Sequence, residues 1–230
     1  MATNSMYENL LALPLFKGVS YNRMSEIVGK TKLAFMKHVP GDVIVRAGEP
    51  CTGLLFVIKG SVRLVITAVN DRFRIGQTIA TPGLISPDFL FGRDTLYPGE
   101  VSAIDEVSLL SIAKADFTTL LRGDDVILFN YLNIISTNAQ KAIDGVMGLS
   151  TGSLEERIAF WIIALTQMGS DNIVLRARKS NLAAIFGVQR SALTSALDSL
   201  RDQGIIEYTA DEITVLDRRA LRNILLKVSI

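Results

Sequence analysis

The sequence has very little cysteine and histidine. Its 230 residues include one cysteine, Cys51, and one histidine, His38. A single cysteine excludes an internal disulfide, and it excludes an iron–sulfur cluster held by four thiolates of this chain. Haem usually takes a His, Cys or other axial ligand, and here His38 and Cys51 are better explained as an ordinary strand end and a turn residue. We therefore expect neither an iron–sulfur cluster nor haem.

The sequence also lacks long apolar runs and an excess of charge of one sign. No run reaches the roughly 18 apolar residues that span a bilayer, and the first residues lack the basic segment of a signal peptide. Together with the single cysteine, this predicts a cytoplasmic protein without a membrane partner. Lys and Arg number 24 against 23 Asp and Glu, so any nucleic-acid surface must gather its charge locally.

Residues typical of enzyme active sites are missing as well. We find no Ser-His-Asp set, no metal-ligand cluster and no glycine-rich phosphate loop followed by Lys. The paired carboxylates Asp124-Asp125 and Glu155-Glu156 stand where helices are expected to start, and the helix dipole explains acidic residues there. We expect that the chain is not an enzyme.

What the sequence does contain is a change of pattern along its length. Residues 5–30 have helical spacing, whereas residues 31–122 carry short apolar or alternating runs separated by glycines. Such runs predict an antiparallel β-roll of the jelly-roll, or double-stranded β-helix, type. We expect an α+β protein with a first domain at 1–122, a long dimerisation helix at 123–149 and a C-terminal domain at 150–230.

Residues 124–149 are predicted to form one long helix with an apolar seam. Its residues recur at alternating intervals of four and three, the spacing of a coiled coil. The seam residues are Leu128, Leu132, Ile135, Ala139, Ala142 and Val146. A second stripe, Ile127, Tyr131 and Ile134, lies beside the seam. One stripe can pack on the roll and the other on a second copy of the chain; the alternative is a helix buried on two sides within one subunit. We favour the homodimer because the heptad pattern outlasts the second stripe.

Small residues mark the end of this helix. Gly145 and Gly148 are expected to weaken it, each by roughly 1 kcal/mol relative to Ala. The stretch 148–153, GLSTGS, predicts a hinge and a domain boundary. Ser153 and Glu156 then match a capping box, which predicts the start of a new helix.

Residues 179–206, KSNLAAIFGVQRSALTSALDSLRDQGII, predict two short helices joined at Gly187. Ser180 is expected to cap the first helix and Gly204 to end the second. The predicted inward face of the second helix is Leu193, Ala196, Leu197 and Leu200. The following stretch, IIEYTADEITVL, reads as strand, turn and strand. This arrangement predicts a winged helix-turn-helix.

In a helix-turn-helix the second helix enters the major groove of DNA. Arg190 can make a two-pronged contact with guanine, and Gln189 can pair with adenine. The hydroxyls of Ser191, Thr194 and Ser195 can donate or accept hydrogen bonds at base edges. Arg178, Lys179 and Ser180, at the start of the first helix, suit a phosphate. The alternative is a polar face that is merely solvated.

These segments together resemble the Crp–Fnr superfamily of bacterial transcription regulators over nearly the whole chain. The stretch 39–65, VPGDVIVRAGEPCTGLLFVIKGSVRLV, is similar to the first half of the family's cyclic-nucleotide-type β-roll, and 179–206 to its DNA-binding signature. The resemblance implies a homodimer that binds double-stranded DNA, with RNA polymerase and a small-molecule effector as further candidate partners. No residue set identifies a polymerase-contact surface.

The chain departs from the cyclic-AMP-binding members inside the roll. In those members a Gly-Glu pair and a later Arg-Ser/Thr-Ala run hold the nucleotide, and the Arg and hydroxyl grip its phosphate. Here Leu84 follows Gly83, while Tyr97 and Pro98 stand at the phosphate-binding positions. Because a phosphate without Arg loses a charge-assisted two-pronged contact, we expect weak or no cyclic AMP binding.

The effector therefore stays unidentified. Arg93, near in sequence, and Arg72 or Arg74 keep an anion site open, so the candidate effector pocket is Gly83, Leu84, Arg93, Tyr97 and Pro98. The alternative is a roll filled by its own side chains, namely Leu84, Ile85, Phe89 and Tyr97.

The predicted recognition helix differs from the family pattern too. The family commonly has Arg-Glu-Thr and a second Arg, whereas this chain has Arg190-Ser191-Ala192 and Ser195. We therefore expect a different preferred DNA sequence. A competing hypothesis is a ligand- or partner-binding module whose helix-turn-helix packs against another protein.

Overall fold

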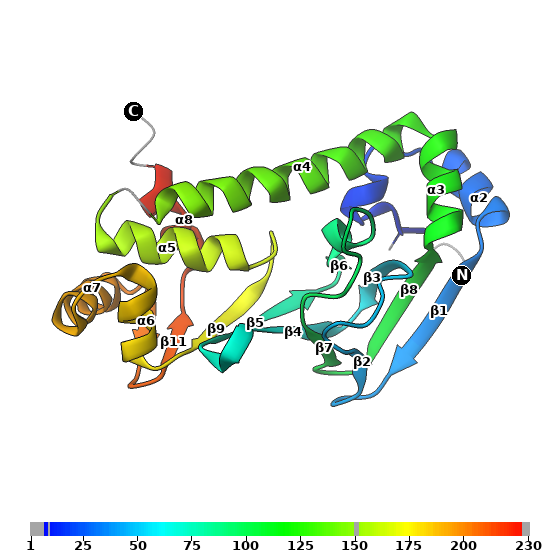
Figure 1. Cartoon of the computed structure of the whole chain (residues 1–230). Helices are drawn as coiled ribbons and strands as arrows, with labels where there is room; N and C mark the ends of the chain where they lie inside the picture. Colours follow the sequence, from blue (N-terminus) through cyan, green and yellow to red (C-terminus); the bar gives the residue numbers. More distant parts are fainter. Residues whose placement is uncertain (1–6, 9, 150–151, 227–230) are drawn as a thin grey trace. The chain divides into compact units, whose positions relative to one another are not determined.

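Short apolar runs separated by glycine turns fold into antiparallel sheets, and helices flank them (Figure 1). The structure, a computed structural model, describes residues 7–8, 10–149 and 152–226. Its contacts divide the chain into two units. The first is Met1–Leu64 with Ile79–Thr137, and the second is Val65–Thr78 with Asn138–Ile230.

The first unit contains the predicted β-roll. One sheet has the order β1-β8-β3-β6, and in the other β2, β7, β4 and β5 are neighbours. Strand β3 is buried over its first five residues, which explains why its run is apolar throughout instead of alternating. The strands are β1 (Leu33–His38), β2 (Val43–Val45), β3 (Gly53–Lys59), β4 (Ser61–Thr67), β5 (Arg74–Ala80), β6 (Gly83–Ile85), β7 (Glu100–Ala103) and β8 (Val107–Ala113).

Helices begin and end the first unit. They are η1 (Pro14–Phe16), α2 (Tyr21–Lys30), α3 (Lys114–Gly123) and the first half of α4 (Asp125–Gly148). Asp124 precedes α4 and accepts from the N–H of Ile127 at 3.1 Å and from Nε of Arg23 at 2.7 Å. Burial raises the pKa of Asp124, but the Arg23 guanidinium and the backbone donors outweigh burial and hold this pKa below its ordinary value.

One side of α4 packs on the roll, as the stripe Ile127, Tyr131 and Ile134 predicted. Ile127 and Tyr131 are buried, and Ile134 is half-buried. The Tyr131 hydroxyl donates to the carbonyl of Pro87 at 2.8 Å, and its ring lies 5.0 Å from that of Phe117.

The second unit contains a helix-turn-helix, a wing and a strand that reading of the sequence missed. Its elements are α5 (Leu154–Leu165), β9 (Asp171–Arg176), α6 (Lys179–Phe186), α7 (Arg190–Asp202), β10 (Ile206–Tyr208), β11 (Glu212–Val215) and α8 (Arg218–Leu226). The predicted capping box is confirmed, because Ser153 Oγ accepts from the Glu156 N–H at 3.2 Å and Glu156 accepts from the Ser153 N–H at 2.7 Å. The predicted hinge at 148–153 includes residues 150–151, which lie outside the described residues.

Residues from the β4–β5 hairpin complete this unit. The segment Val65–Thr78 belongs to it, and β5 pairs with β9 in the register Ile75↔Leu175. Strands β5, β9, β11 and β10 are neighbours in that order. The hairpin is thus part of the sheet beside the helix-turn-helix, although more than 60 residues separate it from α5 in sequence.

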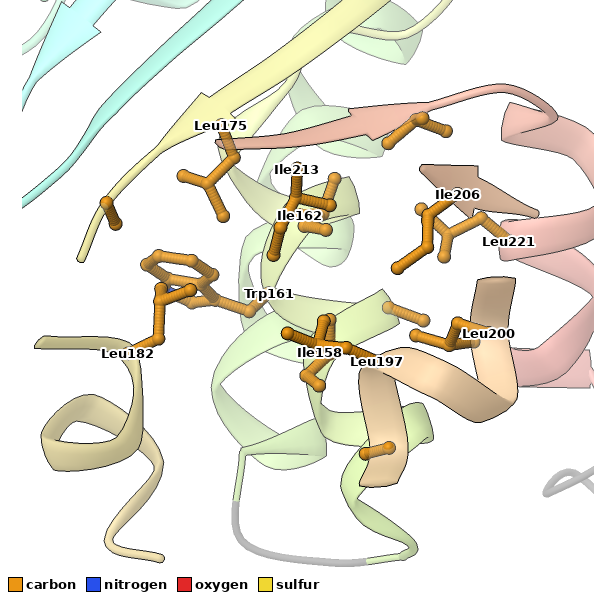
Figure 2. Packing of buried hydrophobic residues seen from close by; sticks show 14 of the residues in the cluster. Ile158, Trp161, Ile162, Leu175, Leu182, Leu197, Leu200, Ile206, Ile213 and Leu221 are labelled. Carbon is orange, nitrogen blue, oxygen red and sulfur yellow. The ribbon is translucent and has the colours of Figure 1, made fainter. Parts of the chain in front are cut away.

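The apolar core of the second unit lies between α5, α7 and this sheet. Figure 2 shows Ile158 of α5 near Leu197 of α7, Trp161 near Leu182 of α6, and Ile162 near Ile213 of the sheet. The same cluster includes Leu200, Leu175 and Ile206. All of these residues are buried. Burying apolar surface contributes roughly 25 cal/mol per Å², so this core is the main source of the unit's stability.

The expectation about Gly145 and Gly148 needs correction. A Cβ on Gly145 would lie 2.2 Å from Cβ of Ala164, and one on Gly148 would lie 2.0 Å from Cγ of Phe160. The end of α4 therefore approaches α5 more closely than any side chain would allow. The two glycines permit this packing, and their intrinsic cost to the helix is the smaller effect.

Candidate nucleic-acid interface and roll interior

Helices α6 and α7 form a tight helix-turn-helix. Gly187 has φ 65° and ψ 35°, the left-handed conformation predicted for the joint, and the Val188 N–H donates to the carbonyl of Ala183 at 3.0 Å. The inward residues of α7, namely Leu193, Ala196, Leu197 and Leu200, are all buried as predicted. This packing fixes which side of α7 faces outward.

The outward face of α7 begins with exposed polar side chains. Gln189 is the N-cap residue, and Gln189, Arg190, Ser191 and Ser195 are exposed. Thr194 is half-buried, and its hydroxyl donates to the carbonyl of Arg190 at 2.9 Å. Four of the five predicted base-reading residues on this helix therefore present their polar groups to the surroundings.

The start of α6 differs in one respect from the prediction. Its N-cap is Arg178, and Ser180 lies inside the first turn, so the expected cap by Ser180 is wrong. The cap makes no side-chain hydrogen bond. The first-turn N–H groups of a helix attract anions, and here they lie beside the guanidinium-bearing Arg178 and the ammonium-bearing Lys179.

Tyr208, which reading of the sequence did not single out, connects the wing to both helices. Its hydroxyl donates to Asp198 Oδ1 at 2.6 Å, and this hydrogen bond raises the pKa of Tyr208. Lys179 Nζ lies 4.5 Å from its ring centroid, and the Arg201 guanidinium lies 5.7 Å from it. The sequence could not predict this role of Tyr208, because its partners Asp198, Lys179 and Arg201 come from two separate helices.

The wing, which is the hairpin of β10 and β11, contacts the segment just before α6. Strands β10 and β11 pair in the register Ile206↔Val215, and the Ala177 N–H donates to the carbonyl of Asp211 in the turn between them. Arg176 Nε and Glu212 Oε2 form an ion pair at 2.7 Å. The wing turn and the start of α6 therefore lie side by side.

The candidate effector residues do not form one cluster of exposed groups. Gly83, Leu84 and Tyr97 are buried, Pro98 is half-buried and Arg93 is exposed. Tyr97 is hydrogen-bonded to the Cys51 thiol; burial and this neighbour raise the pKa of Tyr97, and burial raises that of Cys51. Arg72 and Arg74, also considered for an anion site in the roll, belong to the second unit.

The seam of α4 carries exposed apolar side chains. Leu132, Ala139, Ala142 and Val146 are exposed, while Leu128 and Ile135 are half-buried. Three further residues extend this face, with exposed fractions of 62% for Phe129, 62% for Ile143 and 61% for Met147. Sequence periodicity missed these three because they lie one position away from the predicted seam.

Two other features bear on function. Within residues 7–8, 10–149 and 152–226, no three His, Cys, Asp or Glu side chains are grouped so that they could hold a metal ion. Over the same ranges, no helix has the length and apolar character needed to cross a membrane.

A β-roll of this type followed by a winged helix-turn-helix defines the class of the protein. Family models match both parts: the cyclic nucleotide-binding domain at residues 35–124 and the Crp-like helix-turn-helix domain at residues 156–224. The chain belongs to the Crp–Fnr family of transcription regulators, a DNA-binding family.

Curated relatives cover nearly the whole chain. The cyclic AMP receptor protein of Thermus thermophilus is 25% identical over 218 residues, covering 92% of this chain and 96% of the relative. The cAMP-activated global transcriptional regulator Vfr of Pseudomonas aeruginosa is 25% identical over 197 residues, covering 80% and 89%. The crystal structure of the Thermus thermophilus catabolite activator protein matches with a TM-score of 0.52 and 21% identity, covering 94% of this chain and 99% of that one. That structural match concerns the fold.

Proposed function

We propose that the chain acts as a homodimer that reads a two-fold symmetric DNA site with helix α7. The observation that carries this proposal is the division of α7 into a buried apolar face and an exposed polar start at Gln189, Arg190 and Ser191. An N-terminal turn of this kind fits the major groove, where Arg pairs with guanine and Gln with adenine. Ser195 extends the reading surface, and Thr194 supports it.

Phosphate contacts would come from the start of α6. Arg178 is exposed, and Lys179 and Ser180 are half-buried in the first turn, where the helix dipole favours an anion. Such contacts position the protein without reading sequence, so they supply affinity while α7 supplies specificity.

The second copy would join along α4. The exposed face from Phe129 to Met147 is too long and too apolar for a solvated helix, and its repeat suits a two-stranded coiled coil. The predicted seam residues lie on this face or at its edge. A symmetric dimer would place two α7 helices about one helical turn of DNA apart.

We retain residues 1–122, 123–149 and 150–230 as the functional division, with the first as sensor, the second as dimerisation helix and the third as DNA-binding domain. The hairpin Val65–Thr78 comes from the sensor sequence but packs with the DNA-binding elements. The cytoplasm is the proposed compartment, and RNA polymerase is a proposed further partner.

We further propose that cyclic AMP binds weakly or not at all, although the two curated relatives are named for cyclic AMP. The positions expected to grip the phosphate hold the buried Tyr97 and the half-buried Pro98. Leu84, Ile85 and Tyr97 are buried and Phe89 is half-buried, which favours a roll filled by its own side chains. Calorimetric titration with cyclic AMP is expected to show no saturable binding at micromolar concentrations, and micromolar affinity would reject this part.

Selection of bound duplexes from a random pool tests the proposed DNA reading. We expect an enriched site with two inverted half-sites, and for Arg190→Ala the preference at one base pair of each half-site should be lost. A pool that stays random with the wild-type chain would reject sequence-specific DNA binding.

A further inference from the structure

We propose that the tip of the β4–β5 hairpin is a second contact for the DNA backbone, with Arg72 reaching a phosphate outside the segment read by α7. This inference rests on the proposed function, and it adds an element that lies far from the helix-turn-helix in sequence. The hairpin tip is defined here as residues 68–74, from Ala68 through the turn η2 (Val69–Asp71) to Arg74.

The hairpin tip is attached to the first helix of the helix-turn-helix. Asn181, in the first turn of α6, donates from Nδ2 to the carbonyl of Arg72 at 3.0 Å. In the β5–β9 ladder Arg74 is the direct partner of Arg176, two residues before the α6 N-cap. Arg72 and Arg74 therefore stand beside the end of α6 that is proposed to face phosphate.

The charges around this end of α6 favour an anion. Five cations gather there: Arg72, Arg74, Arg176, Arg178 and Lys179. Three carboxylates oppose them, since Asp71 pairs with Arg74 at 2.7 Å, Glu212 pairs with Arg176 at 2.7 Å, and Asp211 lies in the wing turn. Among the residues that the structure describes, Arg72 and Arg178 form no ion pair with a carboxylate, and both are exposed. The charge available to a ligand is therefore positive and is concentrated on these two side chains.

The support beneath Arg72 is rigid. Phe73 packs edge-on against Trp161 with 4.8 Å between centroids, and Ile75 is fully buried in the core of the second unit. A fixed backbone lowers the ordering cost of an arginine–phosphate contact, because only the side chain is then immobilised. DNA offers a dense row of phosphates along its flanks, so a contact of this kind needs no particular sequence.

The test is the salt dependence of duplex binding by the full chain carrying Arg72→Gln. Because Asn181 bonds to the backbone carbonyl of Arg72, the substitution leaves that attachment in place. We expect several-fold weaker binding to a long duplex, equally for matched and mismatched sites. The slope of log affinity against log salt should fall by about 0.9 for each lost phosphate contact. On a duplex trimmed to the segment under the two α7 helices, wild type and variant should bind alike.

Two controls separate the possible failures. Arg122→Gln removes the same charge from an exposed position on α3, and an equal loss for this variant would show a net-charge effect and overturn the inference. If Arg190→Ala loses discrimination at one base pair of each half-site while Arg72→Gln binds the long duplex with the wild-type affinity and slope, the hairpin contact is wrong and the proposed function stands. If the wild-type chain binds no duplex, both the hairpin contact and the proposed function are wrong.

Discussion

The ring of Phe73 meets the indole of Trp161 edge-on, with 4.8 Å between the ring centroids and an angle of 70° between the planes. Phe73 comes from the connection between β4 and β5, whereas Trp161 comes from α5. With Ile75 and the β5–β9 ladder, this contact makes the hairpin a part of the second unit's core. The stability of the helix-turn-helix therefore depends on a segment that ends about 100 residues before it in the chain.

We predict that Ile75→Ala destabilises the helix-turn-helix unit by about 2–5 kcal/mol, the usual cost of emptying a fully buried Ile site. Trp161 is the single tryptophan and lies in that unit, so its fluorescence during urea unfolding reports the change. The control is Val69→Ala, on the same hairpin but 83% exposed, which should be nearly neutral. Equal midpoints for the two variants would show that the hairpin does not belong to the core.

We predict that Gly145→Ala and Gly148→Ala each destabilise the protein by about 1–3 kcal/mol, the typical cost of overpacking. At an open helical position the same change is stabilising by up to about 1 kcal/mol. Gly29 in α2 provides that comparison, since a Cβ there meets nothing within 4 Å. Thermal unfolding followed by circular dichroism should give lower midpoints for the first two variants and an equal or higher one for Gly29→Ala. Stabilisation by either α4 variant would refute the close helix crossing.

Local structure could be predicted from the sequence here, but tertiary packing partners could not. Periodicity and turn chemistry are local, so they identified the faces of α7, the Gly187 joint and the Ser153–Glu156 cap correctly. The partners of Gly145 and of Ile75 are set by tertiary packing. A glycine in a helix looks unfavourable until the neighbouring helix is known, and a β-strand gives no indication of which sheet it will complete.

The same limit applies to the candidate site. Residue type and helical spacing selected Arg190 and its neighbours, because an exposed polar helix start is visible in sequence. They could not find Tyr208, whose role comes from Lys179, Arg201 and Asp198 meeting around one ring. Phe129, Ile143 and Met147 were missed on α4 because a heptad pattern fixes the spacing of a seam more firmly than its rotation about the helix axis.

We predict that Ile143→Glu converts the proposed dimer to a monomer. A carboxylate on the exposed apolar face of α4 would be buried against the second copy and its own carboxylate, so desolvation and like-charge repulsion both oppose association. Sedimentation equilibrium measures the mass, and Val69→Glu places the same charge at an exposed apolar residue outside the seam as a control. An unchanged mass for Ile143→Glu would rule out this face as the interface.

We predict that Arg190→Ala removes roughly 1–3 kcal/mol of discrimination at one base pair of each half-site, the value of a good two-pronged contact. Thermal stability should stay at the wild-type value because the side chain is exposed. Affinities for the selected site and for single-base variants of it give the discrimination directly. Arg219→Ala, an exposed change on α8, should leave every ratio unaltered. If Arg190→Ala kept the wild-type discrimination, another part of the surface would have to read the bases.

The composition of the DNA complex tests whether two copies of the chain read one duplex together. Analytical ultracentrifugation of the full chain with its selected duplex, combined with a hydroxyl-radical footprint, gives the number of chains and the spacing of protected segments together. We expect two chains per duplex and two protected half-sites centred about one helical turn apart. One chain per duplex with a single protected segment would contradict it.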